Sequence, residues 1–113
     1  MTRARKITEA QITKGIRDLL RCFGVYHWKQ HQGLGSAPGV ADILGIYQGR
    51  MVAIEVKAPG RRVQPGSAQE RFLQNIHENG GIAIEADSVD AMLSGFARYG
   101  IHLPVLIRGN ERG

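Results

Sequence analysis

The chain has 113 residues, of which 42% are hydrophobic, and its 15 basic and 10 acidic side chains give a net charge of +5. This length suits one globular domain, 1–113, with a modest core, and the positive charge favours a polyanionic partner, nucleic acid first. No apolar run approaches the ~20 residues of a membrane span, no signal peptide is recognised, and the single cysteine, Cys22, excludes an intrachain disulfide and fits a reducing compartment.

The first predicted element is a helix that begins at Thr8, after a basic tail over residues 1–6. Thr8 and Gln11 match a capping box, and apolar residues recur at helical spacing until Gly24, a typical helix stop. Glu9 falls with the apolar stripe, where it would be a third acidic group near the sheet, although the helix dipole also favours a Glu in the first turn. The opposite face of this helix is basic and carries Lys14, Arg17 and Arg21.

A short strand is predicted over Val25–Lys29, followed by a loop through Gly39 that is rich in glycine. Tyr26 and Trp28 share one face of this strand. We expect both rings to lie in the core and not to serve as platforms for stacked bases.

Two apolar runs, Ala41–Tyr47 and Met51–Lys57, flank a short turn and predict a β-hairpin. Residues two apart in a strand share a face, so Glu55 and Lys57 point the same way. The hairpin would bring Asp42 close to Glu55. Two carboxylates and an amine around one point suit a divalent metal ion and an activated water.

The same residues also have structural interpretations. Asp42 can cap the preceding loop, and Glu55 can be a solvent-facing strand residue paired with Lys57. The backbone carbonyl of Val56 could join the two carboxylates, because hard cations accept carbonyl oxygens.

A second loop, 58–66, contains two prolines, two glycines and the pair Arg61-Arg62, and a helix then begins at a second capping-box sequence, Ser67–Glu70. Gln69 lies in the first turn of this helix, on its core side. Its amide could reach toward the carboxylates or satisfy a backbone group of the loop.

The remaining chain predicts a strand over Ile82–Ala86 and a third helix that begins near Ser88 and stops at Gly100. A last strand is expected over Ile101–Arg108, where Pro104 confines it to an edge of the sheet, and residues 109–113 are expected to fray. The order helix, strand, hairpin, helix, strand, helix predicts a small mixed α/β domain whose central sheet is covered by helices, with a βαβ crossover before Ile82–Ala86.

These motifs, taken in order, resemble the VRR-NUC branch of the PD-(D/E)xK nucleases from about Glu9 to Leu93. The resemblance is carried by Gly39-x-x-Asp42, Glu55-Val56-Lys57 and Ser67-x-Gln69. One departure is Ala41, where the family usually has a proline before the aspartate. That proline shapes the strand and is not a ligand.

The resemblance implies a restriction-endonuclease-like fold, a mixed central sheet flanked by helices, and a Mg²⁺- or Mn²⁺-dependent endonuclease. The implied metal ligands are Glu9, Asp42, Glu55 and the backbone carbonyl of Val56. Lys57 would orient or activate the attacking water, and Gln69 would support the site. Stand-alone members of the family are typical of phages, which implies an intracellular, cytoplasmic protein of a phage or bacterium.

We therefore expect a deoxyribonuclease that acts on branched DNA, four-way junctions above all, and works as a homodimer. The side chains expected to contact DNA are Lys14, Arg17, Lys29, Arg61 and Arg62. The dimer is suggested by the two-fold symmetry of a junction and by the apolar run 101–107, which would invite pairing if exposed. Two alternatives stay open: a catalytically silent DNA-binding module of the same fold, and a small basic RNA-associated protein without a metal site.

Overall fold

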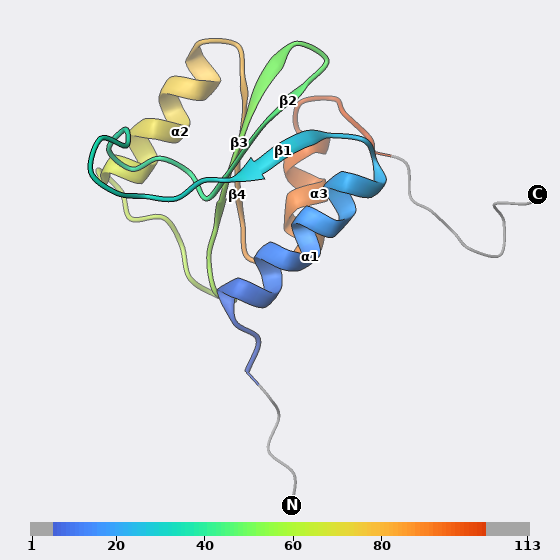
Figure 1. Ribbon diagram of the computed structural model, residues 1–113, viewed down its shortest axis with the longest axis horizontal. Coiled ribbons are helices and arrows are strands. Elements are labelled where there is room, and N and C mark those ends of the chain that lie inside the picture. Colours follow the sequence, from blue (N-terminus) through green and yellow to red (C-terminus); the bar gives the residue numbers. More distant parts are fainter. Residues whose placement is uncertain (1–5, 104–113) are drawn as a thin grey trace, which may run out of the picture.

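A computed structural model describes residues 6–103, which form a four-stranded sheet with helices on both of its faces (Figure 1). The elements occur in the predicted order. They are α1 (Glu9–Cys22), β1 (Tyr26–Lys29), β2 (Ile43–Tyr47), β3 (Arg50–Val56), α2 (Ala68–Glu78), β4 (Ile82–Ala86) and α3 (Val89–Ala97).

The sheet has the strand order β1-β2-β3-β4. Neighbouring strands are antiparallel except β3 and β4, which are parallel and are joined through α2. The predicted βαβ crossover is therefore confirmed. Because β1, β3 and β4 run in one direction, their C-terminal ends and the start of β2 lie at the same end of the sheet.

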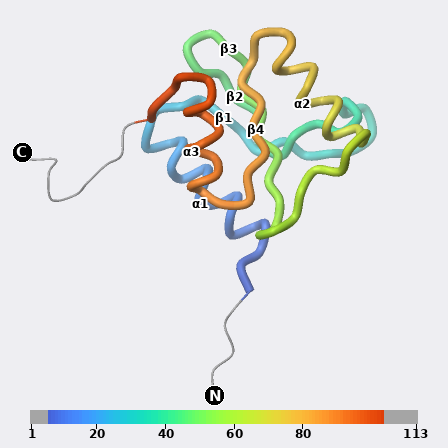
Figure 2. Tube along the Cα trace, turned by 180° about the vertical axis from the view of Figure 1, so that it is seen from behind, coloured from blue at the N-terminus to red at the C-terminus, as the bar shows by residue number. Residues whose placement is uncertain are grey.

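The two faces of the sheet belong to two separate cores. α1 and α3 cover one face, where the largest fully buried side chains include Ile16, Leu20, Ile54 and Phe96. α2 covers the other face with Phe72, Leu73 and Ile76, which pack on a smaller cluster of Val40, Ala41, Leu44 and Ala53. The opposite view shows the same division, with α2 on one side of the strands and α1 and α3 on the other (Figure 2).

The two helices with predicted capping boxes both begin as expected, but only one box is complete. In the first, the Thr8 side chain accepts from the Gln11 N–H and the Gln11 side chain accepts from the Thr8 N–H. In the second, the Ser67 hydroxyl accepts from the Glu70 N–H, whereas the Glu70 carboxylate accepts from the Gly66 N–H, at 2.7 Å. The second helix therefore fixes the end of the loop before it.

The hairpin turn sets the register of β2 against β3. Gln48 and Gly49 have φ values of 49° and 81°, and two consecutive positive φ angles are the signature of a tight turn that matches the twist of the strands. Tyr47 consequently pairs with Arg50, and at the other end of the ladder Ile43 pairs with Ile54. The predicted hairpin is therefore paired along its whole length, up to the end of the sheet where the candidate site residues lie.

The expectation that Tyr26 and Trp28 lie in the core is wrong, because the two residues are 70% and 37% exposed. They share a sheet face with Leu44 of the smaller cluster, since Trp28 pairs with Leu44. α2 packs on β3 and β4, so the corresponding face of β1 has no helix over it. β1 and β2 also begin slightly later than predicted, at Tyr26 and Ile43.

The predicted last strand, Ile101–Arg108, falls partly outside the described residues. Residues 101–103 are not in a strand, and Leu103 packs in the larger core. The rest of that segment, the frayed end at 109–113 and most of the basic tail at 1–6 lie outside residues 6–103. Within that range, no helix is both long and apolar enough to cross a membrane.

Candidate active site

The hairpin register brings the two predicted carboxylates together. Asp42 lies one residue before β2 and Glu55 one residue after Ile54, so the two face each other on the rung next to the Ile43–Ile54 pair. The Asp42 carboxylate accepts a hydrogen bond from the Val56 N–H, with 2.8 Å between Val56 N and Asp42 Oδ2. The first carboxylate is thus held by the strand that carries the second.

Glu55 is buried, with only 4% of its surface exposed. The alternative of a solvent-facing strand residue is therefore wrong. Its Oε2 lies 3.5 Å from the Lys57 Nζ, which confirms that the two side chains share a face. Its Oε1 is buried and has no hydrogen-bond partner within the described residues. A buried carboxylate oxygen without a partner is costly for a protein, so this atom is suited to bind a ligand.

The pKa of Glu55 is raised from 4.5 to about 7, first because the carboxyl is buried and second because the negative charge of Asp42 lies close to it. The ammonium group of Lys57 opposes this shift. A like charge and a loss of water both favour the protonated carboxyl. Without a bound cation, a proton on Glu55 therefore reduces the negative charge of the carboxylate pair, as a cation would.

In the absence of divalent metal, the protein is expected to lose stability as the pH rises from about 5 to about 8. The folded state holds the Glu55 proton more tightly than the unfolded state, so the stabilisation is present at the lower pH and is lost as the pH passes through about 7. A pKa shift from 4.5 to about 7 corresponds to on the order of 3 kcal/mol. Thermal unfolding in EDTA measures it, and Glu55→Gln should raise the melting temperature at the higher pH and far less at the lower one.

Glu78→Gln is the matched control, because Glu78 is exposed in the last turn of α2 and the change in net charge is the same. Its melting temperature should follow the wild-type pH profile. If the melting temperatures of Glu55→Gln and Glu78→Gln depended on pH in the same way, the raised pKa of a buried Glu55 would be contradicted.

The residues at this point fit a hard divalent cation. Val56 donates its N–H toward Asp42, and in a strand the carbonyl of the same residue points to the same neighbour, so the Val56 carbonyl faces the Asp42 side as well. Mg²⁺ commonly binds one or two carboxylates and keeps several waters. Within residues 6–103, no three His, Cys, Asp or Glu side chains gather as a metal cluster, so water would complete this coordination.

The structure treats the two remaining predicted residues differently. Glu9 is exposed in the first turn of α1 and is not gathered with the carboxylate pair. Gln69 is half-buried in the first turn of α2. That turn lies against the loop leading into Asp42, because a Cβ on Gly39 would be 2.5 Å from the Gln69 N. Gly39, with a φ of +70°, permits this close approach where another residue would clash.

Glu85 is a further carboxylate at this end of the sheet, and sequence reasoning did not select it. It is the parallel partner of Glu55 on β4, and its side chain accepts a hydrogen bond from the Val63 N–H. Asp87 similarly accepts from the Gly60 N–H, at 3.2 Å. These two side chains fix the loop that follows Lys57. The predicted parallel crossover could have pointed to Glu85, because parallel pairing of the two strands sets Glu85 beside Glu55.

The predicted DNA-binding side chains form two groups beside opposite edge strands. Lys14, Arg17 and Lys29 line a cavity of about 180 Å³ between α1 and β1. Lys14 and Arg21 there both bond Asp18, at 2.8 and 2.9 Å, and these partners hold the pKa of Asp18 below its usual range. The second group, Arg61 and Arg62, lines a cavity of about 290 Å³ next to β4.

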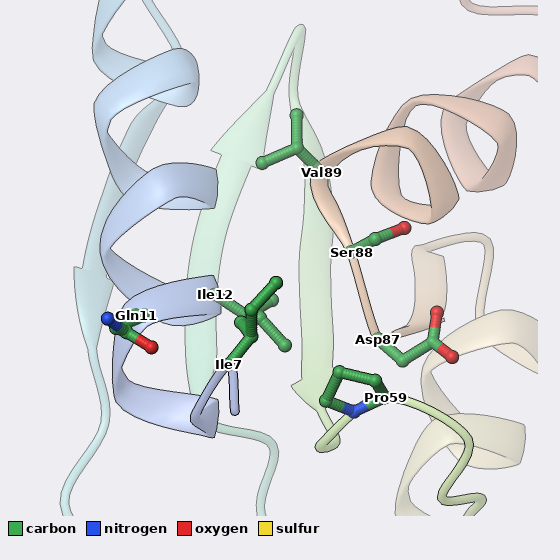
Figure 3. Close-up of a pocket in the computed structure, with 7 residues that line it drawn as sticks. All are labelled: Ile7, Gln11, Ile12, Pro59, Asp87, Ser88 and Val89. Atoms are coloured by element: carbon green, nitrogen blue, oxygen red, sulfur yellow. The ribbon is translucent and has the colours of Figure 1, made fainter. Parts of the chain in front are cut away.

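A larger cavity, of about 490 Å³, lies between the N-terminal end of α1 and the start of α3 (Figure 3). Ile7 and Ile12 project toward Pro59 there, and Asp87 is the one charged residue in its lining among the described residues. None of Asp42, Glu55 and Lys57 lines it. This mostly apolar cavity is therefore separate from the candidate active site.

Comparisons with known proteins support the fold. No family model and no curated protein matches the sequence. A solved structure described as a "VRR_NUC domain protein" is similar over 84% of this chain and 89% of that chain, with a TM-score of 0.65 and 18% sequence identity. At this identity the likeness is one of fold, and it confirms the expected mixed sheet flanked by helices.

Proposed function

We propose that this chain is a metal-dependent nuclease that hydrolyses phosphodiester bonds of DNA. The observation that carries the proposal is the meeting of Asp42, buried Glu55 and Lys57 at one end of the sheet, with one Glu55 oxygen lacking a partner among the described residues. The fold shared with a VRR_NUC domain protein supports the same function.

Asp42, Glu55 and the Val56 carbonyl would hold the proposed cation, Mg²⁺ or Mn²⁺. When bound, such a cation would lower the pKa of a water molecule and neutralise charge on the phosphate. Asp42 is kept in place by the Val56 N–H, and Glu55 is kept in place by burial and by Lys57. The site is therefore ordered before substrate arrives, which limits the reorganisation needed during reaction.

Lys57 is proposed to position the attacking water. Its side chain is 24% exposed and its Nζ lies 3.5 Å from Glu55 Oε2, so the ammonium group can contact both the attacking water and the incoming phosphate. Gln69 is proposed to support the site from the first turn of α2. Glu9 is proposed as a further acidic ligand, which requires the exposed first turn of α1 to come closer when substrate binds.

The two cationic cavities are proposed to hold the DNA backbone on either side of the cut. Lys14, Arg17 and Lys29 lie beside β1, whereas Arg61 and Arg62 lie beside β4. The net charge of +5 favours a polyanion, and phosphate contacts by such side chains position DNA without reading its sequence.

The proposed substrate is branched DNA, above all the four-way junction, cut by a homodimer in the cytoplasm of a bacterium or a phage-infected cell. A two-fold symmetric junction needs paired cuts, and a symmetric dimer supplies two sites. The apolar run 101–107 lies mostly outside the described residues. The exposed side chains of Tyr26, Trp28 and Ile46 offer a further apolar surface that a partner subunit could cover.

A panel of DNA substrates tests this function. We expect cleavage with Mg²⁺ and none in EDTA, with four-way junctions cut faster than linear duplex by about tenfold or more, since paired sites match paired strands. Light scattering at micromolar concentration should give a dimer mass. Equal rates on junction and duplex would refute selectivity, and a monomer mass would refute the symmetric mechanism.

The same panel separates the alternatives. DNA binding without cleavage under any divalent metal would favour the catalytically silent module. Binding to RNA but not to DNA would favour the RNA-associated protein.

A further inference from the structure

We propose that Arg61, Arg62 and Arg98 form a binding site for a backbone phosphate of DNA, beside β4 and apart from the scissile phosphate. The proposal rests on the proposed nuclease function. It adds Arg98, at the end of α3, to a pair of arginines from the loop after β3.

The three arginine side chains line one cavity of about 290 Å³. Its α3 wall consists of Ala91, Ser94 and Arg98, which lie three and four residues apart and therefore occupy one face of the helix. The other wall is the loop with Arg61 and Arg62. All three arginines are exposed, so a ligand can reach them from solvent.

The carboxylates in this cavity are already engaged elsewhere. Glu85 accepts a hydrogen bond from the Val63 N–H, and Asp87 accepts one from the Gly60 N–H. Within residues 6–103, the ion pairs involve Lys14, Arg21 and Lys57 and none of the three cavity arginines. The two acidic side chains thus hold the loop in place, while the arginines keep their charge for an outside anion.

A phosphate is the anion that this arrangement fits best. Arginine presents a planar fork of donors that matches phosphate oxygens, and several arginines together are typical of phosphate recognition. A phosphate in a DNA strand brings neighbouring negative charges that the other basic cavity can bind.

The cavity lies next to the candidate active site but does not include it. Glu85 lines the cavity and is the direct partner of Glu55 on the adjacent strand. Neighbouring strands are about 4.8 Å apart, so the lining of the cavity comes within one strand of Glu55. The bound phosphate would therefore be a neighbour of the one that is cut, and it would set the register of the strand in the active site.

DNA binding as a function of salt tests this site. Fluorescence anisotropy with labelled duplex DNA, in EDTA so that nothing is cut, should give a log–log salt slope that is shallower by about 1 for Arg98→Gln. The affinity of that variant should fall roughly fivefold at moderate salt. Arg98→Lys should keep the slope but recover only part of the affinity, because an ammonium group lacks the fork.

Arg50→Gln is the control for the change in net charge, because Arg50 begins β3 at the opposite end of the sheet, where its Nε donates to the Gly80 carbonyl. It should leave the slope unchanged. An Arg98→Gln slope and affinity equal to those of Arg50→Gln would overturn the phosphate site while leaving the nuclease proposal intact. A lower melting temperature without any change in DNA binding would also overturn it, since arginine at a helix end can act on the helix dipole alone. Failure of the wild-type protein to bind either duplex or four-way-junction DNA would instead overturn the nuclease proposal itself.

Discussion

Asp42→Asn and Glu55→Gln are each expected to slow DNA cleavage by more than about 10³-fold while DNA binding persists. Each substitution removes one negative charge from the proposed cation site and keeps the shape of the side chain. An amide oxygen carries no net charge, so it is a weaker ligand for the cation than a carboxylate oxygen. The amide oxygen in Asp42→Asn can nevertheless accept from the Val56 N–H as the carboxylate does, so the strand ends should stay in place.

Single-turnover cleavage in Mg²⁺ and anisotropy in EDTA measure the two halves of this prediction. Glu78→Gln, an exposed change on α2, should cleave at the wild-type rate. Glu9→Gln belongs in the same series. A comparable loss of cleavage rate would support Glu9 as a metal ligand, whereas an unchanged rate would leave Asp42 and Glu55 as the two carboxylate ligands. Cleavage at the wild-type rate by Asp42→Asn or Glu55→Gln would contradict a role of the two carboxylates in the reaction.

Lys57→Ala is expected to lower turnover at saturating DNA by about 10²- to 10⁴-fold, the range typical of a side chain that aids proton transfer. Its affinity for DNA should change little. The reason is geometric: Lys57 is paired with buried Glu55, so its charge is directed at the reacting centre and not along the DNA backbone. Turnover and affinity must therefore be measured separately.

Lys29→Ala provides the opposite pattern. Lys29 ends β1 and lines the cavity beside α1, so its loss should weaken binding and flatten the salt slope while turnover at saturation stays close to wild type. If Lys57→Ala behaves in that way as well, Lys57 is an electrostatic anchor and not a participant in the reaction.

The hairpin and the helix starts could be predicted from the sequence because their causes are local. A capping residue, a short turn and alternating apolar positions act over a few neighbours in the chain. Together they were enough to place Asp42 opposite Glu55 and to put Lys57 on the same face. The same local rules could not show that Glu55 is buried, because burial depends on which distant parts of the chain pack around it.

Features that depend on which helix covers which strand could not be predicted from the sequence. Tyr26 and Trp28 alternate like core residues, but α2 covers β3 and β4 and leaves their face of β1 open. Glu85 and Arg98 were also missed, for a related reason. Their positions follow from the parallel pairing of β3 with β4 and from the packing of α3 on β4, which no spacing in the chain specifies.

The Gln48–Gly49 turn has a consequence for how this chain can vary. Surface turns usually tolerate insertions and deletions. Here, as long as the turn keeps two residues, one residue added or lost would slide β3 by one rung and place Ile54 or Val56 opposite Asp42 instead of Glu55. The length of the turn at the far end of the hairpin therefore decides which side chain of β3 lies opposite Asp42.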